Sequence, residues 1–183
     1  MTLGEFMEKM DQVRKELAEG FKKLVKEADE CSAALWDVGY DSDEYDVGMW
    51  LFLLTCVIAA ADGVFSEDEF EFLMDAFGLD ITKEQAIEVI SDIDIEEFVQ
   101  GSIPSPLVAA VELANNNEQA KDFPRYLIRL AERAGKAAAF VDTHIAELEN
   151  TVLETYIKTL NDYVDENSTS ASGVSGVAAP RKG

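Results

Sequence analysis

The spacing of apolar residues limits the fold of this chain more than any other feature, because they recur every three or four positions along most of its length. The first run follows Thr2 and Glu5, which make a capping-box start. Its apolar members are Phe6, Met10, Val13, Leu17, Phe21, Leu24, Ala28, Cys31 and Leu35. This pattern predicts a long amphipathic helix over residues 1–36. No stretch alternates convincingly with the period of two that a half-buried strand needs, so we expect an all-α protein, a compact bundle of about six to eight helices.

This first helix has a seam close to the heptad period, which suits either the domain's own core or a second helix from another chain. Gly20 and Ala28 weaken the seam and favour the first alternative. Homodimerisation through the N-terminal helix stays open.

Turn and cap signals divide the rest of the chain into further helices. We expect a second helix at about residues 44–61, with Gly63 ending it in a left-handed conformation. Ser66 with Glu69, and Thr82 with Gln85, are two further capping boxes. Later helices are predicted at residues 107–114, after Phe123-Pro124 and at residues 148–164.

The length of 183 residues suits one domain with a proper core, which we assign to residues 1–165. Trp36 and Trp50 are expected to pack in that core. Residues 166–183 are small and polar with Pro and Gly, which predicts a flexible tail or a linker.

Charge and cysteine content limit the partners and the compartment. The net charge of -22 repels phosphate backbones, which argues against nucleic acid and favours cations or a basic protein surface as partners. The most apolar stretch, residues 49–61, is shorter than the roughly 18 residues of a membrane span, so we expect no membrane insertion. Cys31 and Cys56 lie in apolar surroundings without a C-x-x-C partner, and we interpret them as inert core thiols of a reduced, cytoplasmic protein.

An acidic motif occurs twice, at a separation of eighty residues. The segment VIAAADGVFSEDEF, ending at Phe70, aligns with AAAFVDTHIAELEN, ending at Asn150. Asp and Glu recur at the same places in both copies, in the pattern D-x-x-(apolar)-x-E-x-E. The acids of the first copy are Asp62, Glu67 and Glu69, and those of the second are Asp142, Glu147 and Glu149.

These carboxylates are candidate ligands of a divalent metal ion. Hard cations such as Ca²⁺ need several oxygen ligands at once, and a helix end followed by the next helix's first turn can direct two carboxylates to one point. The first copy also looks like the second half of an EF-hand loop, but Ile58 and Ala60 stand where the first-half acids belong. A complete EF-hand is excluded, so Asp142 and Glu149 are the candidates for the missing ligands. The alternative is that the acids only end one helix and cap the next.

The stretch LLTCVIAAADGVFSEDEFEFLMDAFGL resembles the tellurite-resistance TerB-like family, whose signature is A-x-A-D-G-x-(apolar)-S-x-x-E. The resemblance implies an all-helical fold with two pseudo-repeated acidic motifs that bind divalent metal. It makes Asp62, Glu69, Asp142 and Glu149 the candidate ligands, with Glu67 and Glu147 as neighbours. Thr143 and Ala146 replace the Gly and Ser of the signature in the second copy. Relatives also occur as accessory regions of ATPases and of stress-response or secretion machinery.

Signatures of catalysis are missing from the sequence. The one histidine, His144, provides neither a catalytic His beside a nucleophile nor a multi-histidine zinc site, and we expect it to be exposed. No phosphate-binding glycine motif appears. We therefore expect no enzyme but a TerB-like metal-binding domain, with Ca²⁺ favoured and Mg²⁺, Mn²⁺ or Zn²⁺ as alternatives, acting in a stress (tellurite-type) response or within a larger machinery. The other hypothesis is a metal-free acidic module that binds a basic protein.

Overall fold

A computed structural model of the chain describes residues 3–140 and 146–169. Within these ranges the chain forms eight α-helices, two short 3₁₀ helices and no β-strand, which confirms the predicted all-α bundle. The elements are, in order, α1 (Leu3–Trp36), η1 (Asp43–Tyr45), α2 (Val47–Ala59), α3 (Glu67–Phe77), α4 (Lys83–Ser91), α5 (Ile95–Gly101), α6 (Ser105–Asn116), η2 (Glu118–Ala120), α7 (Phe123–Ala139) and α8 (Ala146–Asn167).

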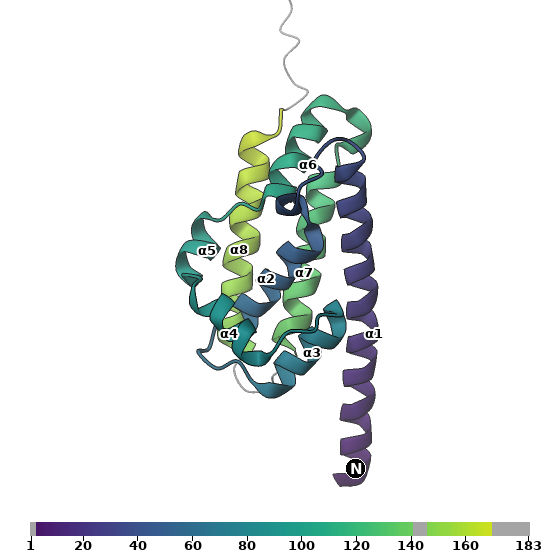
Figure 1. Cartoon of the computed structure of the whole chain (residues 1–183), viewed down its shortest axis with the longest axis vertical. Coiled ribbons are helices and arrows are strands. Elements are labelled where there is room, and N and C mark those ends of the chain that lie inside the picture. Colours follow the sequence, from purple (N-terminus) through teal and green to yellow (C-terminus); the bar gives the residue numbers. More distant parts are fainter. Residues whose placement is uncertain (1–2, 141–145, 170–183) are drawn as a thin grey trace, which may run out of the picture.

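Helix α2 forms the centre of the bundle. It is apolar on nearly every side, as expected of a helix that is surrounded by protein. It packs against α1, α3, α4, α7 and α8. Figure 1 shows α1 along one side of the body, α7 and α8 running the length of the bundle, and the shorter α4 and α5 on the opposite side from α1.

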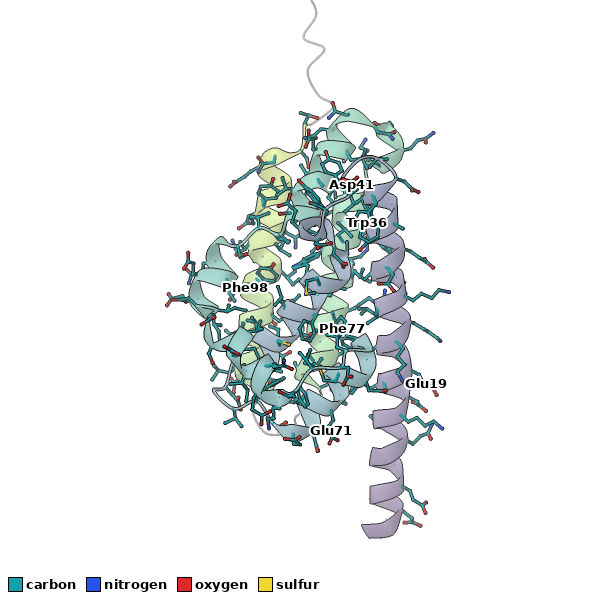
Figure 2. All side chains as sticks on the ribbon, in the orientation of Figure 1. Glu19, Trp36, Asp41, Glu71, Phe77 and Phe98 are labelled. Carbon is teal, nitrogen blue, oxygen red and sulfur yellow. The ribbon has the colours of Figure 1, made fainter. Side chains whose placement is uncertain are left out.

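The long helix α1 joins the bundle through the seam predicted for it. Its residues Phe21, Leu24, Ala28, Cys31 and Leu35 are all buried. The ring of Phe21 meets those of Phe72 and Phe77 edge to face, with centroids 5.4 and 5.3 Å apart. Figure 2 shows Phe77 within the body, whereas Glu19 lies on the outer side of α1.

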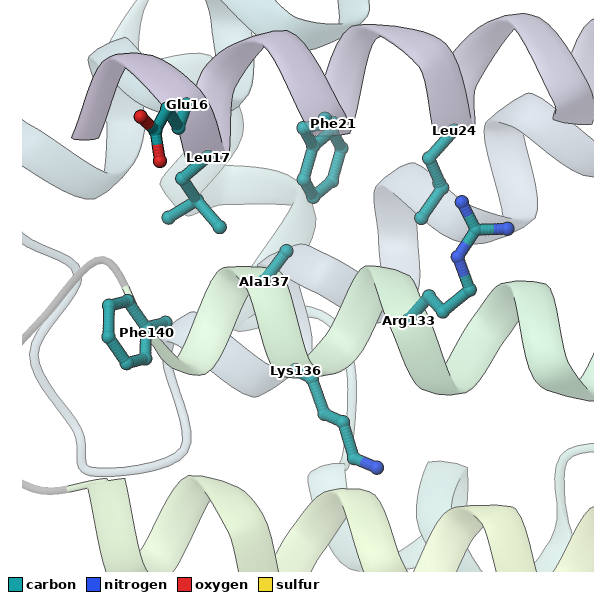
Figure 3. Close-up of a pocket in the computed structure, with 9 residues that line it drawn as sticks. Glu16, Leu17, Phe21, Leu24, Arg133, Lys136, Ala137 and Phe140 are labelled. Atoms are coloured by element: carbon teal, nitrogen blue, oxygen red, sulfur yellow. The ribbon is translucent and has the colours of Figure 1, made fainter. Parts of the chain in front are cut away.

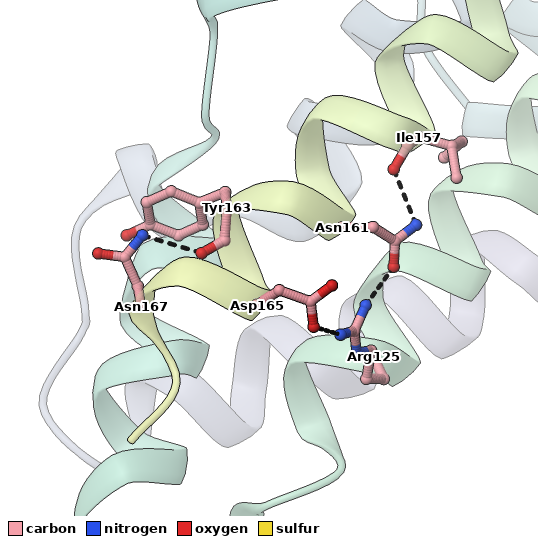
Figure 4. A network of polar contacts seen from close by, with 6 residues as sticks. All are labelled: Arg125, Ile157, Asn161, Tyr163, Asp165 and Asn167. Atoms are coloured by element: carbon pink, nitrogen blue, oxygen red, sulfur yellow. Dashed lines mark hydrogen bonds and ion pairs between the residues drawn. The ribbon is translucent and has the colours of Figure 1, made fainter. Parts of the chain in front are cut away.

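Helix α7 joins α8 through both apolar packing and a polar network. The guanidinium of Arg125 on α7 donates hydrogen bonds to Asn161 and Asp165 on α8 (Figure 4). Asn161 in turn donates to the carbonyl of Ile157 at 2.8 Å. The network fixes the register of the two helices near the C-terminal end of α8.

Several local expectations need correction. Helix α2 spans Val47–Ala59 instead of residues 44–61, because the Asp46 side chain accepts a hydrogen bond from the Met49 N–H at 2.9 Å and caps the helix there. Gly63 does have a positive φ of 85°, but in the turn after the helix has ended. Trp36 is 44% exposed instead of buried, since it lies about 100° around α1 from the buried Leu35.

Two further elements differ from the sequence-based expectations. Helix α5 was not predicted, although the Asp94 side chain caps it by accepting from the Glu97 N–H at 3.0 Å. Helix α8 extends to Asn167, beyond the predicted domain boundary at residue 165, and the Thr169 N–H donates to the side chain of Asn115 at 2.8 Å. Most of the predicted tail, residues 170–183, lies outside the described residues.

The two cysteines are buried, as predicted. Burial raises the pKa of the thiol to about 11 for Cys31 and about 12 for Cys56, so both are protonated and unreactive at neutral pH. No helix among the described residues combines the length and the apolar character needed to cross a membrane.

Candidate metal centre

The two acidic motifs fall at two matching helix junctions. Helix α2 ends at Ala59 and α7 ends at Ala139, again eighty residues apart. The residues that cap them have nearly the same backbone conformation: φ -90° and ψ 0° at Ala60, φ -90° and ψ -13° at Phe140. Figure 1 shows that α2 and α7 end, and α3 and α8 begin, toward the same end of the molecule, the lower one in that view. The two copies of the acidic motif therefore share not only a sequence pattern but also a similar geometry at the preceding helix end.

Asp62 shapes the turn of the first junction. Its Oδ1 accepts a hydrogen bond from the Val64 N–H at 2.7 Å, which closes a short side-chain turn around Gly63. The side chain is partly exposed. This bond occupies one carboxylate oxygen and orients the group.

Glu69 closes the capping box that begins α3. The Glu69 N–H donates to Ser66 Oγ at 3.2 Å, and Glu69 Oε2 accepts from the Ser66 N–H at 2.7 Å. The predicted capping box is thus confirmed, and so is the one formed by Thr82 and Gln85. Unlike an ordinary surface cap, however, Glu69 is only 1% exposed.

Glu149 has the corresponding position in the second copy. It lies in the first turn of α8 and is also only 1% exposed. Among the Asp and Glu side chains in the described part of the chain, Glu69 and Glu149 alone are buried. Burial of a carboxylate is costly unless another group compensates its charge. Glu69 and Glu149 occupy equivalent positions in the two copies of the acidic motif, eighty residues apart. They are also the two acids that are buried, whereas the other described Asp and Glu side chains are not.

Glu67 and Glu147, the neighbours in the motifs, are exposed. Glu67 forms an ion pair with Lys83 at the start of α4, in which Lys83 Nζ lies 3.0 Å from Glu67 Oε2. The sequence signal for this contact was that Lys83 is the only base between Glu27 and Glu118. Both residues thus lie on the surface, each two positions before the buried acid of its motif.

The structure brings together only part of the predicted ligand set. Asp142 and His144 lie outside the described residues. Among the residues that are described, no three His, Cys, Asp or Glu side chains form a group that could hold a metal ion. The predicted ligands among the described residues are Asp62 and Glu69 at one junction and Glu149 at the other. Carboxylate oxygens are the donors that hard divalent cations prefer, so these residues fit such an ion chemically.

Some buried polar residues were not identified from the sequence. Ser32 on α1 accepts a hydrogen bond from the Val47 N–H at 2.9 Å and thereby ties α1 to the start of α2. Thr55 is fully buried and donates to the carbonyl of Phe52 at 2.8 Å. Neither residue belongs to a recognisable motif, and both roles are structural.

Comparison with protein-family models, curated proteins and solved structures finds no match to this chain.

Proposed function

We propose that the chain is a non-enzymatic, TerB-like domain that binds one or more divalent metal ions at the two acidic helix junctions. Asp62 and Glu69 provide oxygen ligands from the first junction, and Asp142 and Glu149 provide them from the second. Carboxylate oxygens suit any hard divalent cation, and Ca²⁺ is favoured among them because it takes more oxygen ligands, in a more flexible geometry, than Mg²⁺ does. Binding a cation to these groups would reduce the repulsion between two acidic helix starts.

The observation that carries this proposal is the burial of Glu69 and Glu149, at equivalent positions of the internal repeat. A helix cap has no need of a buried acid, because exposed caps such as Asp94 serve the same purpose in this protein. Two equivalent acids withdrawn from water are typical of functional sites in which specific groups compensate the charge, and a bound cation can be one of these groups.

The biological setting follows from the resemblance alone. We propose a cytoplasmic role in a stress response of the tellurite type, or a role as an accessory module of an ATPase or similar machinery. The acidic surface, with its net charge of -22, favours a basic protein surface as the contact in either case.

The test is a thermal-unfolding titration of the full chain after removal of metal with a chelator. Ca²⁺, Mg²⁺, Mn²⁺ and Zn²⁺ are added separately to the wild type and to the variants Asp62→Asn, Glu69→Gln, Asp142→Asn and Glu149→Gln. A saturable rise in Tm is expected, equivalent to about 2.7 kcal/mol at a hundred times Kd. Each variant should reduce or abolish this rise.

The chosen substitutions separate metal binding from capping. Gln at position 69 can still accept from the Ser66 N–H, and Asn at position 62 can still accept from the Val64 N–H, so both keep the local hydrogen bonds. Glu71→Gln on α3 and Glu154→Gln on α8 are matched controls, because they remove one exposed charge from the same helices. A metal response that is absent from the wild type, or equal in Glu69→Gln and Glu71→Gln, would rule out the proposed site.

A second function, a metal-free module for a basic partner, is favoured by the surface around α5. Asp94, Glu96 and Glu97 are exposed there and line shallow pockets that also include Phe98. Acids around an aromatic ring suit a basic peptide segment. A flat metal titration combined with binding of a basic peptide that is lost in Glu97→Lys would favour this function over the first.

A further inference from the structure

The N-terminal part of α1 extends beyond the body of the protein. Helix α1 has 34 residues and is therefore about 51 Å long. Figure 1 shows its first turns continuing past the lower end of the bundle. We call residues 3–15 the arm. None of the arm side chains that the structure describes is buried, and among the described side chains of α1 the first buried one is that of Phe21.

The apolar seam of α1 nevertheless continues into the arm. In the sequence, Phe6, Met10 and Val13 continue the spacing of Leu17 and Phe21. An isolated helix of this length is marginal in water, because most helical stability in proteins comes from packing of an apolar face. The arm thus has the apolar pattern of a helix that packs against a partner, and none of the labelled helices packs along it in Figure 1.

A groove lies between α1 and α7, next to the C-terminal end of the arm (Figure 3). It has a volume of about 490 Å³ and is lined by Glu16, Leu17, Gly20, Phe21, Leu24, Arg133, Lys136, Ala137 and Phe140. Figure 3 shows Leu17 and Phe21 of α1 directed toward Ala137 of α7, with Phe140 at the end of α7. Phe140 is 64% exposed, which is unusual for a ring of this size.

Charge distinguishes this side of the molecule from the others. Outside α1 and α7, the bases in the described residues are Lys83, Lys121 and Lys158. Helix α7 alone carries Arg125, Arg129, Arg133 and Lys136, and α1 carries six more bases. Two copies of a strongly acidic chain repel each other over most of their surfaces, so the side formed by α1 and α7 is the one on which they can approach.

The two bases at the groove edge, Arg133 and Lys136, are held in place by ion pairs with Glu27 and Glu132. The guanidinium of Arg133 donates to the two carboxylate oxygens of Glu27 at 2.6 and 3.2 Å. This hydrogen bonding lowers the pKa of Glu27, so the pair stays charged at neutral pH. The first turns of the arm carry Glu5 and Glu8, which complement a basic edge.

We propose that the groove binds the arm of a second copy of this chain, in a two-fold dimer with the two arms antiparallel. A two-fold axis that crosses the arm near Val13 places residues that lie equally far before and after Val13 opposite one another. Because each residue adds about 1.5 Å along a helix, the first turns of one copy then lie beside Gly20 and Phe21 of the other. The same axis sets Lys9 of each copy opposite Glu16 of the other. One contact is then used twice, as two-fold symmetry requires.

The test is sedimentation equilibrium of the full chain between about 1 and 200 μM, in chelator, so that the result does not depend on metal binding. The wild type should approach twice the chain mass of 20.2 kDa. Val13→Glu and Leu17→Glu place a charge in the seam and should raise the dimer Kd by roughly 100-fold or more. Ala33→Glu, on an exposed face of α1 in the body, adds the same charge and should leave Kd unchanged.

Charge reversal tests the antiparallel arrangement without disturbing the apolar seam. Lys9→Glu and Glu16→Lys should each raise Kd by roughly 3- to 10-fold, because each places like charges opposite one another. The double variant should return to within about twofold of the wild type. A wild type that stays monomeric at every concentration, a Val13→Glu variant that dimerises like the wild type, or a double variant without rescue would each overturn the proposal.

Discussion

Single buried polar contacts hold the centre of the bundle at fixed positions. Trp50 on α2 donates its indole N–H to the hydroxyl of Tyr156 on α8, at 3.0 Å. The Tyr156 ring stacks on Phe98 of α5, with centroids 5.1 Å apart, and is fully buried. Burial also raises the pKa of the Tyr156 hydroxyl, so this group stays protonated at neutral pH. One residue thus connects three helices that are distant in sequence.

Tyr156→Phe is expected to destabilise the protein by about 1–3 kcal/mol. The substitution keeps the stacked ring but leaves the Trp50 N–H without its acceptor in an apolar interior. Denaturant unfolding monitored by tryptophan fluorescence measures the loss. Tyr163→Phe, on the same helix but only partly buried, should change stability by less than about 0.5 kcal/mol. Equal effects of the two substitutions would show that the Trp50 contact contributes nothing.

At the scale of elements, α7 and α8 approach each other closely at Gly135. A Cβ atom built on Gly135 would lie 2.4 Å from Cδ1 of Leu153, nearer than any real carbon contact. Leu153 is itself buried, with 2% of its surface exposed, and has little room to move. The absence of a side chain at this position therefore sets the distance between the two helices that flank the second acidic junction.

Gly135→Ala is expected to destabilise the protein by about 1–3 kcal/mol through overpacking, although alanine is the better helix former. Gly20→Ala is the matched comparison, because nothing lies within 4 Å of a Cβ at that position of α1. It should stabilise the protein by about 0.5–1 kcal/mol. Chemical denaturation at low protein concentration measures both. If both substitutions stabilise, Leu153 repacks freely and the close approach is unimportant.

For the molecule as a whole, the dominant feature is charge. The net charge of -22 lies on a chain whose bases gather on α1 and α7, so the acids of α4 and α5 repel one another on the side opposite α1. Ion pairs such as Lys83 with Glu67 reduce this repulsion only locally. Net charge of this size keeps a protein soluble but lowers the stability of its compact state.

Added monovalent salt is expected to raise Tm. Raising NaCl from about 50 to 500 mM shortens the Debye length several-fold and screens the repulsion, which should increase Tm by about 2–6 °C. The increase should be the same in the wild type and in Glu69→Gln, since screening does not depend on one buried acid. Differential scanning calorimetry in chelator measures it, and a fall in Tm with salt would mean that attractive pairs outweigh repulsion. The same series provides the baseline for the metal titrations.

The features that the sequence determined are those that depend on neighbouring residues. Helical spacing predicted the all-α class, and the capping boxes of α3 and α4 follow from hydrogen bonds that span three residues. The repeated acidic motif likewise identified Glu69 and Glu149 as a related pair. The predictions of the helical class and of the capping boxes succeeded because propensity, apolar period and cap chemistry act over one or two helical turns.

Tertiary structure alone decided what depends on contacts between distant segments. Glu69 and Glu149 are buried, whereas Glu67 and Glu147 are exposed, although all four residues are glutamates of the same motif. The difference depends on which helices cover each junction. The groove between α1 and α7, and the length of α1 left outside the body, likewise depend on where the other helices end. A sequence pattern specifies which face of a helix is apolar, but only the packing of the whole chain decides how much of that face is covered.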